Sequence, residues 1–99
     1  MYTQNDKVLR DNISDLMKYK PIGNYLFAKY NLLGLCYYKL NNYAKALKYY
    51  SKAENHAEKP KDVINVMYQK SQCYWFLKEE AKYHKQIKKI ERYKKEHLN

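Results

Sequence analysis

The segment 27–60 constrains this chain most, because bulky and small side chains alternate along it at helical spacing. Read with a helical period, it gives two apolar stripes, formed by Tyr30, Leu33, Gly34 and Tyr37 in the first half and by Tyr43, Ala46, Leu47, Tyr50 and Ala53 in the second. Small side chains let two helices approach closely, while large ones fill the gaps between them. The segment therefore predicts a closely packed pair of helices.

The order of these residues resembles the tetratricopeptide repeat, whose signature runs aromatic, Leu-Gly, Tyr, Ala, aromatic and Pro along two helices. Tyr30 stands where Trp is usual, and Pro60 comes two residues late. A shift of 37 residues lays LGLCYYKL over KSQCYWFL, so that Cys36 meets Cys73. Further along, larger residues replace the small ones of the first repeat, which predicts a degenerate second repeat with a looser hairpin.

The resemblance implies an all-α fold of five helices, a tetratricopeptide-like stack that forms a short right-handed α-solenoid. We expect helices at 6–18, 22–39, 43–56, 61–77 and 79–96. They would form one domain over 1–99, with a leading helix at about 5–20, a repeat at 27–60 and a degenerate repeat at 61–97. The leading helix resembles the second half of a repeat whose first half is missing, and a plain capping helix is the alternative.

Charge and composition restrict the partners and the cellular location of this domain. The chain has 20 Lys and Arg against 10 Asp and Glu, a net charge of +10 that attracts nucleic acid, acidic proteins or anionic lipid at long range. No apolar run approaches the ~20 residues of a membrane span, and residues 1–10 lack the apolar region of a secretory signal. Two cysteines, Cys36 and Cys73, predict buried free thiols and a cytoplasmic location.

The resemblance also implies a partner-binding surface, because the first helices of stacked repeats line a concave groove in this family. The groove positions carried over onto this sequence are Asn31, Leu35, Tyr38 and Lys39 in the first repeat, with Ala28 beside them, and Asn65, Tyr68, Gln72, Trp75 and Phe76 in the second. Amides can hold a peptide backbone, and Tyr and Trp are frequent interaction hot spots. The alternative is that the aromatic residues only pack against neighbouring helices.

A carboxylate clamp, by which chaperone-binding members of the family capture chaperone C-termini, is missing from the first repeat. Its Lys and Asn positions hold Asn31 and Leu35, and its second Asn position holds Leu32. We therefore do not expect a co-chaperone.

A second candidate surface is a basic stripe on the last helix, formed by Lys78, Lys82, Lys85, Lys89 and Arg92 at spacings of three and four. Such a stripe can contact phosphates and give salt-dependent binding. No nucleic-acid-binding motif accompanies it, and lysine faces are commonly only solvated.

No catalytic arrangement is visible, since the three histidines lie far apart and no Ser-His-Asp set, carboxylate pair or Gly-rich loop occurs. We expect no enzyme, cofactor or metal. The predicted function is a protein- or peptide-binding module, a small regulatory adaptor or antagonist. Its long repeat period resembles that of bacterial Rap-like receptors, which sense secreted peptides. The alternative is a basic nucleic-acid-associated protein. Because solenoids need ~3 repeats to cover their faces, we also expect self-association or a bound partner.

Overall fold

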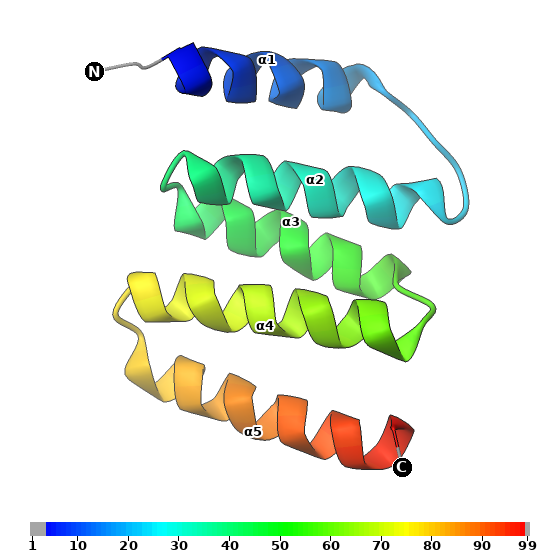
Figure 1. Ribbon diagram of the computed structural model, residues 1–99, viewed down its shortest axis with the longest axis vertical. Coiled ribbons are helices and arrows are strands. Elements are labelled where there is room, and N and C mark those ends of the chain that lie inside the picture. Colours follow the sequence, from blue (N-terminus) through cyan, green and yellow to red (C-terminus); the bar gives the residue numbers. More distant parts are fainter. Residues whose placement is uncertain (1–3, 99) are drawn as a thin grey trace.

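The computed structural model describes residues 4–98, and these residues form five α-helices and no strand. The helices are α1 (Gln4–Lys18), α2 (Tyr25–Lys39), α3 (Tyr43–His56), α4 (Pro60–Phe76) and α5 (Glu80–His97). Figure 1 shows them stacked in chain order, with consecutive helices running in opposite directions. The predicted all-α stack is thus the architecture of the chain.

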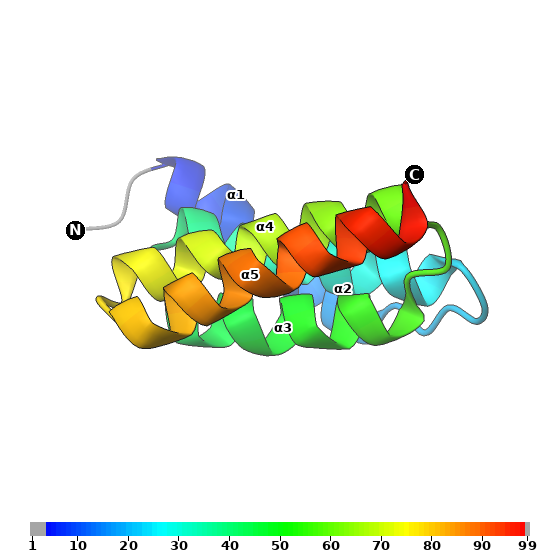
Figure 2. The ribbon, with the colours of Figure 1, turned by 90° about the horizontal axis from the view of Figure 1, so that it is seen from below.

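Each helix packs on the next one along the chain, which gives a flat molecule with extents of 42 × 34 × 16 Å. Seen from below, α5 lies in front, with α4 above it and α3 beneath it (Figure 2). The α2–α3 hairpin is the more closely packed of the two hairpins. The looser second hairpin agrees with its larger side chains.

Turn residues decide where the helices begin and end. Asn41 takes the left-handed backbone (φ 62°) between α2 and α3, and the side chain of Asn42 accepts a hydrogen bond from the Lys45 amide at 3.3 Å. Pro60 occupies the first turn of α4, where its missing N–H costs nothing. The expected start of the second helix at residue 22 is wrong, because Gly23 has a φ of 62° and delays α2 to Tyr25.

The centre of the core is a cluster from α3 and α4, against which side chains of α2 pack; its members are Ala46, Tyr50, Ala53, Val66 and Cys73. Gly34 allows α2 to approach α3 closely, because a Cβ at Gly34 would lie 2.6 Å from ring atoms of Tyr50. Cys36 and Cys73 are both buried and free, as predicted.

A half-buried ion pair joins the two repeats. Glu54 on α3 accepts from Lys70 Nζ on α4 at 2.9 Å, and Lys89 Nζ on α5 lies 3.8 Å from its other carboxylate oxygen. This contact links α3 to α4 beside the core cluster that the two helices share.

Candidate partner-binding face on α2 and α4

The nine predicted groove residues, here called the α2–α4 face, differ in exposure between the two helices. All five on α4 are exposed, and three of them are aromatic: Tyr68 at 40%, Phe76 at 50% and Trp75 at 61%. On α2, Lys39 is exposed, whereas Asn31, Leu35 and Tyr38 are half-buried. Large exposed aromatic side chains are unusual on a small domain and mark interaction surfaces.

Tyr38 and Phe76 come together at the end of the two helices. Phe76 stacks on Tyr43 of α3, with ring centroids 4.7 Å apart, and Tyr38 meets both rings edge-on at 5.4 and 6.0 Å. Burial is the main cause that raises the pKa of Tyr38, with smaller contributions from Tyr43 and Cys73. This aromatic cluster joins α2, α3 and α4, so Tyr38 and Phe76 stabilise the stack as well as contributing to its surface.

Trp75 and Tyr68 instead turn toward α5. The Trp75 ring lies 5.3 Å from that of Tyr83, and Tyr68 accepts a hydrogen bond from Lys94 Nζ at 2.7 Å, with the ammonium 5.0 Å from its ring centroid. The structure therefore brings one pair of predicted residues together between α2 and α4 and places the other pair on the α5 side of α4. Helical spacing in the sequence predicted which positions of α4 are exposed. It did not predict that the aromatic side chains divide between the α2 side and the α5 side of that helix.

Two amides, one on this face and one beside it on α4, have unsatisfied oxygens. Asn31 Oδ1 and Gln69 Oε1 are buried and accept no hydrogen bond from the described residues. Gln69 lies between Val66 and Cys73 at spacings of three and four, on the side of α4 that enters the core. Gln69 was not singled out from the sequence as a functional residue, although its spacing from these apolar residues places it on the buried side of the helix.

The basic stripe is only partly free to bind an anion. Lys78 lies in the turn before α5, with a φ of 59°, and not on the predicted helix. Lys82 pairs with Glu79 at 3.0 Å, a hydrogen bond that raises the pKa of the lysine, and Lys89 lies near Glu54. Lys85 and Arg92 are exposed on α5.

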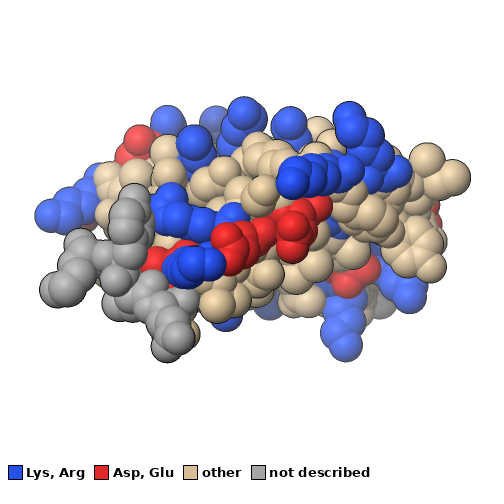
Figure 3. Space-filling model, turned by 90° about the horizontal axis from the view of Figure 1, so that it is seen from above, with Lys and Arg blue, Asp and Glu red and all other residues tan. Residues whose placement is uncertain are grey.

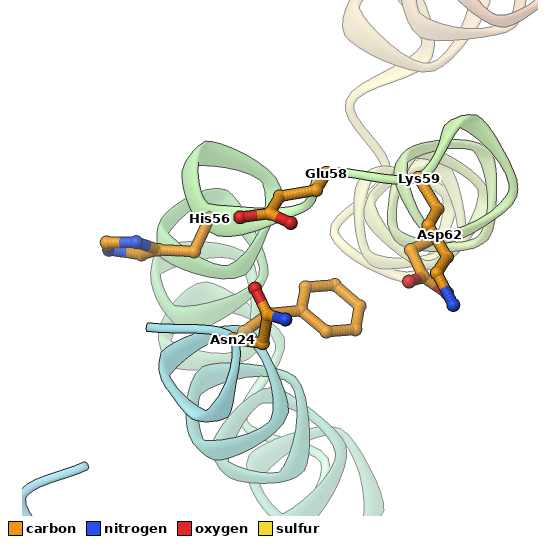
Figure 4. Close-up of a pocket in the computed structure, with 6 residues that line it drawn as sticks. Asn24, His56, Glu58, Lys59 and Asp62 are labelled. Carbon is orange, nitrogen blue, oxygen red and sulfur yellow. The ribbon is translucent and has the colours of Figure 1, made fainter. Parts of the chain in front are cut away.

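A small hollow of about 190 Å³ lies at the junction of the repeats, where α2 begins and α3 gives way to α4. Figure 4 shows Asn24 and Glu58 pointing toward one another across it, with Lys59 and Asp62 on the α4 side. With its amide nitrogen turned to Glu58, Asn24 donates to both carboxylate oxygens, at 3.0 and 3.1 Å. These hydrogen bonds link the start of α2 to the α3–α4 linker, and no sequence motif indicates this contact.

Metal ligands do not gather anywhere in residues 4–98: no group of three or more His, Cys, Asp or Glu side chains could hold an ion there. None of the described helices has the length and apolar character needed to cross a membrane.

Comparison with known protein families identifies the central part of the chain. Residues 27–60 match the family model described as Tetratricopeptide repeat, a segment that covers most of α2, all of α3 and the linker to Pro60. No curated protein and no solved structure matches the chain. The match and the five stacked helices confirm a tetratricopeptide-like all-α stack. Repeats of this family generally mediate protein–protein interactions, which supports a binding module with a protein partner.

Proposed function

We propose that this chain is a non-catalytic adaptor or antagonist that binds a peptide segment of another protein on the α2–α4 face. The observation that carries the proposal is the set of exposed aromatic side chains on α4, of which Trp75 is the most exposed. Burying such a ring on binding contributes about 25 cal/mol for each Å² of apolar area. Gln72 and Asn65 lie on the same exposed side of α4 and would donate to and accept from a peptide backbone.

The biological role that we propose is regulatory. The long repeat period is similar to that of Rap-like peptide-sensing receptors, and the chain would act by occupying a partner's surface through the α2–α4 face. The net charge of +10 would speed the encounter with an acidic partner.

The test is a nuclease-treated pull-down that compares wild type with Trp75→Ala and Gln72→Ala. Both residues are exposed, so these variants should keep the fold, which a circular dichroism melt would verify; Tyr38→Ala is less suitable because Tyr38 packs between α3 and α4. Tyr25→Ala, which removes an exposed aromatic ring at the start of α2, is the matched control. We expect one specific protein to be retained by wild type and Tyr25→Ala and lost from the other two.

The alternative is phosphate binding by α5. It predicts capture that survives Trp75→Ala, disappears with nuclease and weakens steeply with salt and with charge reversal at Lys85 and Arg92. That outcome would move the function from the α2–α4 face to α5. The carboxylates beside Lys82 and Lys89 weigh against it.

A further inference from the structure

A second surface, remote from Trp75, lies between α1 and α2. A hollow of about 380 Å³ there, which we call the α1–α2 groove, is lined by Asn12, Asp15, Leu16, Tyr19, Leu32 and Cys36. Tyr19 and Leu32 are 50% and 47% exposed, although both are large and apolar. No residue of α1 is buried in the described part of the chain.

The same kind of groove occurs once more in the molecule, and there it is filled. The 37-residue shift that relates the two repeats also lays α1 on α3, so that Asn12, Leu16 and Cys36 correspond to Tyr49, Ala53 and Cys73. These three counterparts are all buried. Their cover comes largely from α2, whose Tyr37 ring stacks on Tyr49 at 5.5 Å and whose Tyr30 ring lies 6.4 Å away.

The correspondence between the two grooves indicates which kind of element the α1–α2 groove could accept. The helix that fills the equivalent groove, α2, packs on both α3 and the cluster that contains Cys73. No described helix takes that place beside α1, which packs on α2 alone among the pairs that make extended contact. The groove therefore has the shape and the apolar floor for one further helix, antiparallel to α1 and parallel to α2.

The charge at the groove indicates the chemistry of its occupant. Asp15 corresponds to Lys52, whose ammonium lies 5.5 Å from the Tyr30 ring centroid. The Asp15 carboxylate is exposed and has no ion-pair partner among residues 4–98. It belongs to a helix with three aspartates, and Figure 3 shows acidic atoms in a band across the face that α1 presents, with basic residues on both sides.

We propose that the α1–α2 groove binds a single amphipathic helix of a partner protein, with an apolar stripe on the groove floor and an Arg or Lys opposite Asp15. The cation occupies the position that Tyr30 holds in the filled groove. This site does not depend on the α2–α4 face.

A second copy of this chain does not fit the groove as part of its own stack. The two helices that could enter, α2 and α4, are each followed by a helix packed against them, α3 or α5. That following helix would need the space beside the groove that α1 already occupies. A lone helix has no such conflict.

The test uses two synthetic peptides of residues 25–39, labelled with fluorescein and both carrying Cys36→Ser. One carries Tyr30→Arg and the other Tyr30→Glu, and their binding to the full chain is followed by fluorescence anisotropy. The Arg peptide should bind saturably and about fivefold more tightly than the Glu peptide. The overall positive charge of the protein favours the Glu peptide, so the opposite preference isolates the effect of Asp15.

Three protein variants assign the binding to the groove. Asp15→Lys should reverse the preference between the peptides, and Leu32→Glu should weaken both by at least about tenfold, since it places a carboxylate on the apolar floor. Trp75→Ala should leave both affinities unchanged, which separates this site from the α2–α4 face. Asp15 and Leu32 are exposed, so the fold should persist; if Leu32→Glu does not fold, the reversal by Asp15→Lys decides.

Several results would overturn the proposal: no saturable binding of either peptide, full binding to folded Leu32→Glu, or no reversal with Asp15→Lys. Sedimentation velocity of the protein alone tests the other occupant. A wild-type dimer that becomes a monomer with Leu32→Glu would assign the groove to a second copy and reject a partner helix.

Discussion

At the scale of single residues, Gly34 permits a close approach of α2 to the Tyr50 ring of α3. We predict that Gly34→Ala lowers the free energy of unfolding by about 1–3 kcal/mol, because the new Cβ would overlap the Tyr50 ring, which is itself fully buried. Urea unfolding followed by circular dichroism measures this.

The repeat supplies a matched control for that change. Ser71 corresponds to Gly34 in the second repeat, and there the side chain is accommodated, its hydroxyl donating to the Tyr68 carbonyl at 2.6 Å. Ser71→Ala should cost no more than about 1 kcal/mol. Equal losses in the free energy of unfolding would mean that the close approach of Gly34 to Tyr50 does not require glycine.

A half-buried and a buried glutamine allow a second comparison. Gln69 Oε1 has no donor among residues 4–98, whereas Gln86 Nε2 donates to the Met67 carbonyl at 3.2 Å. We predict that Gln69→Met raises the free energy of unfolding by about 1 kcal/mol, because it removes an unsatisfied buried acceptor. Gln86→Met should lower it by a similar amount, because it removes this buried hydrogen bond.

Urea midpoints of the two glutamine variants, measured side by side, check this pair. A loss of stability in Gln69→Met would show that the Gln69 amide is satisfied in solution.

At the scale of helices, α1 should be the least stable element. None of its side chains is buried in the part of the helix whose burial is described, and the hydrogen bond that Tyr49 Oη donates to Met17 Sδ is long, at 3.8 Å. We predict that amides of α1 exchange with solvent at a much lower opening free energy than those of α2 and α3.

Native-state hydrogen exchange with mass spectrometry resolves these segments. Adding the Tyr30→Arg peptide should slow exchange in α1, because the bound helix would cover its inner side. Equal protection of α1 and α3 in the free protein would contradict the prediction.

The core between α2, α3 and α4 should weaken in alkali. Burial raises the pKa of the Cys73 thiol from an ordinary value near 9 to about 11, and it also raises the pKa of Tyr50. Between these two pH values the unfolded chain releases a proton that the folded chain retains. The contribution of Cys73 to the free energy of unfolding is therefore constant below pH 9. It falls by an amount on the order of 2 kcal/mol as the pH rises from 9 to 11.

Urea unfolding at pH 8, 9, 10 and 11 and constant ionic strength, with Cys73→Ala as the control, measures this loss. Lysine deprotonation affects both proteins alike, so the difference between their slopes reports the thiol. Identical dependence of stability on pH in the two proteins would show that the Cys73 thiol does not cause the loss in alkali.

At the scale of the whole molecule, much of the fold was predictable because its signals are local. The Asn41–Asn42 turn, Pro60 and the alternation of large and small residues determine α3 and its neighbours. The start of α2 was missed because the apolar spacing of the helix extends back to Ile22. The left-handed backbone of Gly23 prevents the helix from beginning before Tyr25.

Less of the candidate site was predictable, because its contacts cross between helices. Helical spacing gave the exposed positions on α4 but could not show that Phe76 stacks on Tyr43 or that Trp75 turns to Tyr83. Those directions depend on how α4 is rotated against α3, and so on the packing of Ala53, Val66 and Cys73 between the two helices. The α1–α2 groove is likewise a property of the stack, because its walls come from two helices.

The net charge of +10 also acts on the molecule as a whole, because like charges on a flat, thin stack repel one another. Raising sodium chloride from 20 to 200 mM shortens the Debye length from roughly 20 to 7 Å. We predict that the melting temperature rises by a few degrees over this range, since screening relieves the repulsion in the folded state more than in the expanded unfolded chain.

A double variant, Lys85→Glu with Arg92→Glu, provides the control for this salt effect. It removes two exposed positive charges from α5 and adds two negative ones, so its melting temperature should start higher and respond less to salt. Differential scanning fluorimetry across a salt series measures both proteins. A wild-type melting temperature that stays constant or falls would mean that ion pairs such as Glu54–Lys70, which salt weakens, outweigh the overall repulsion.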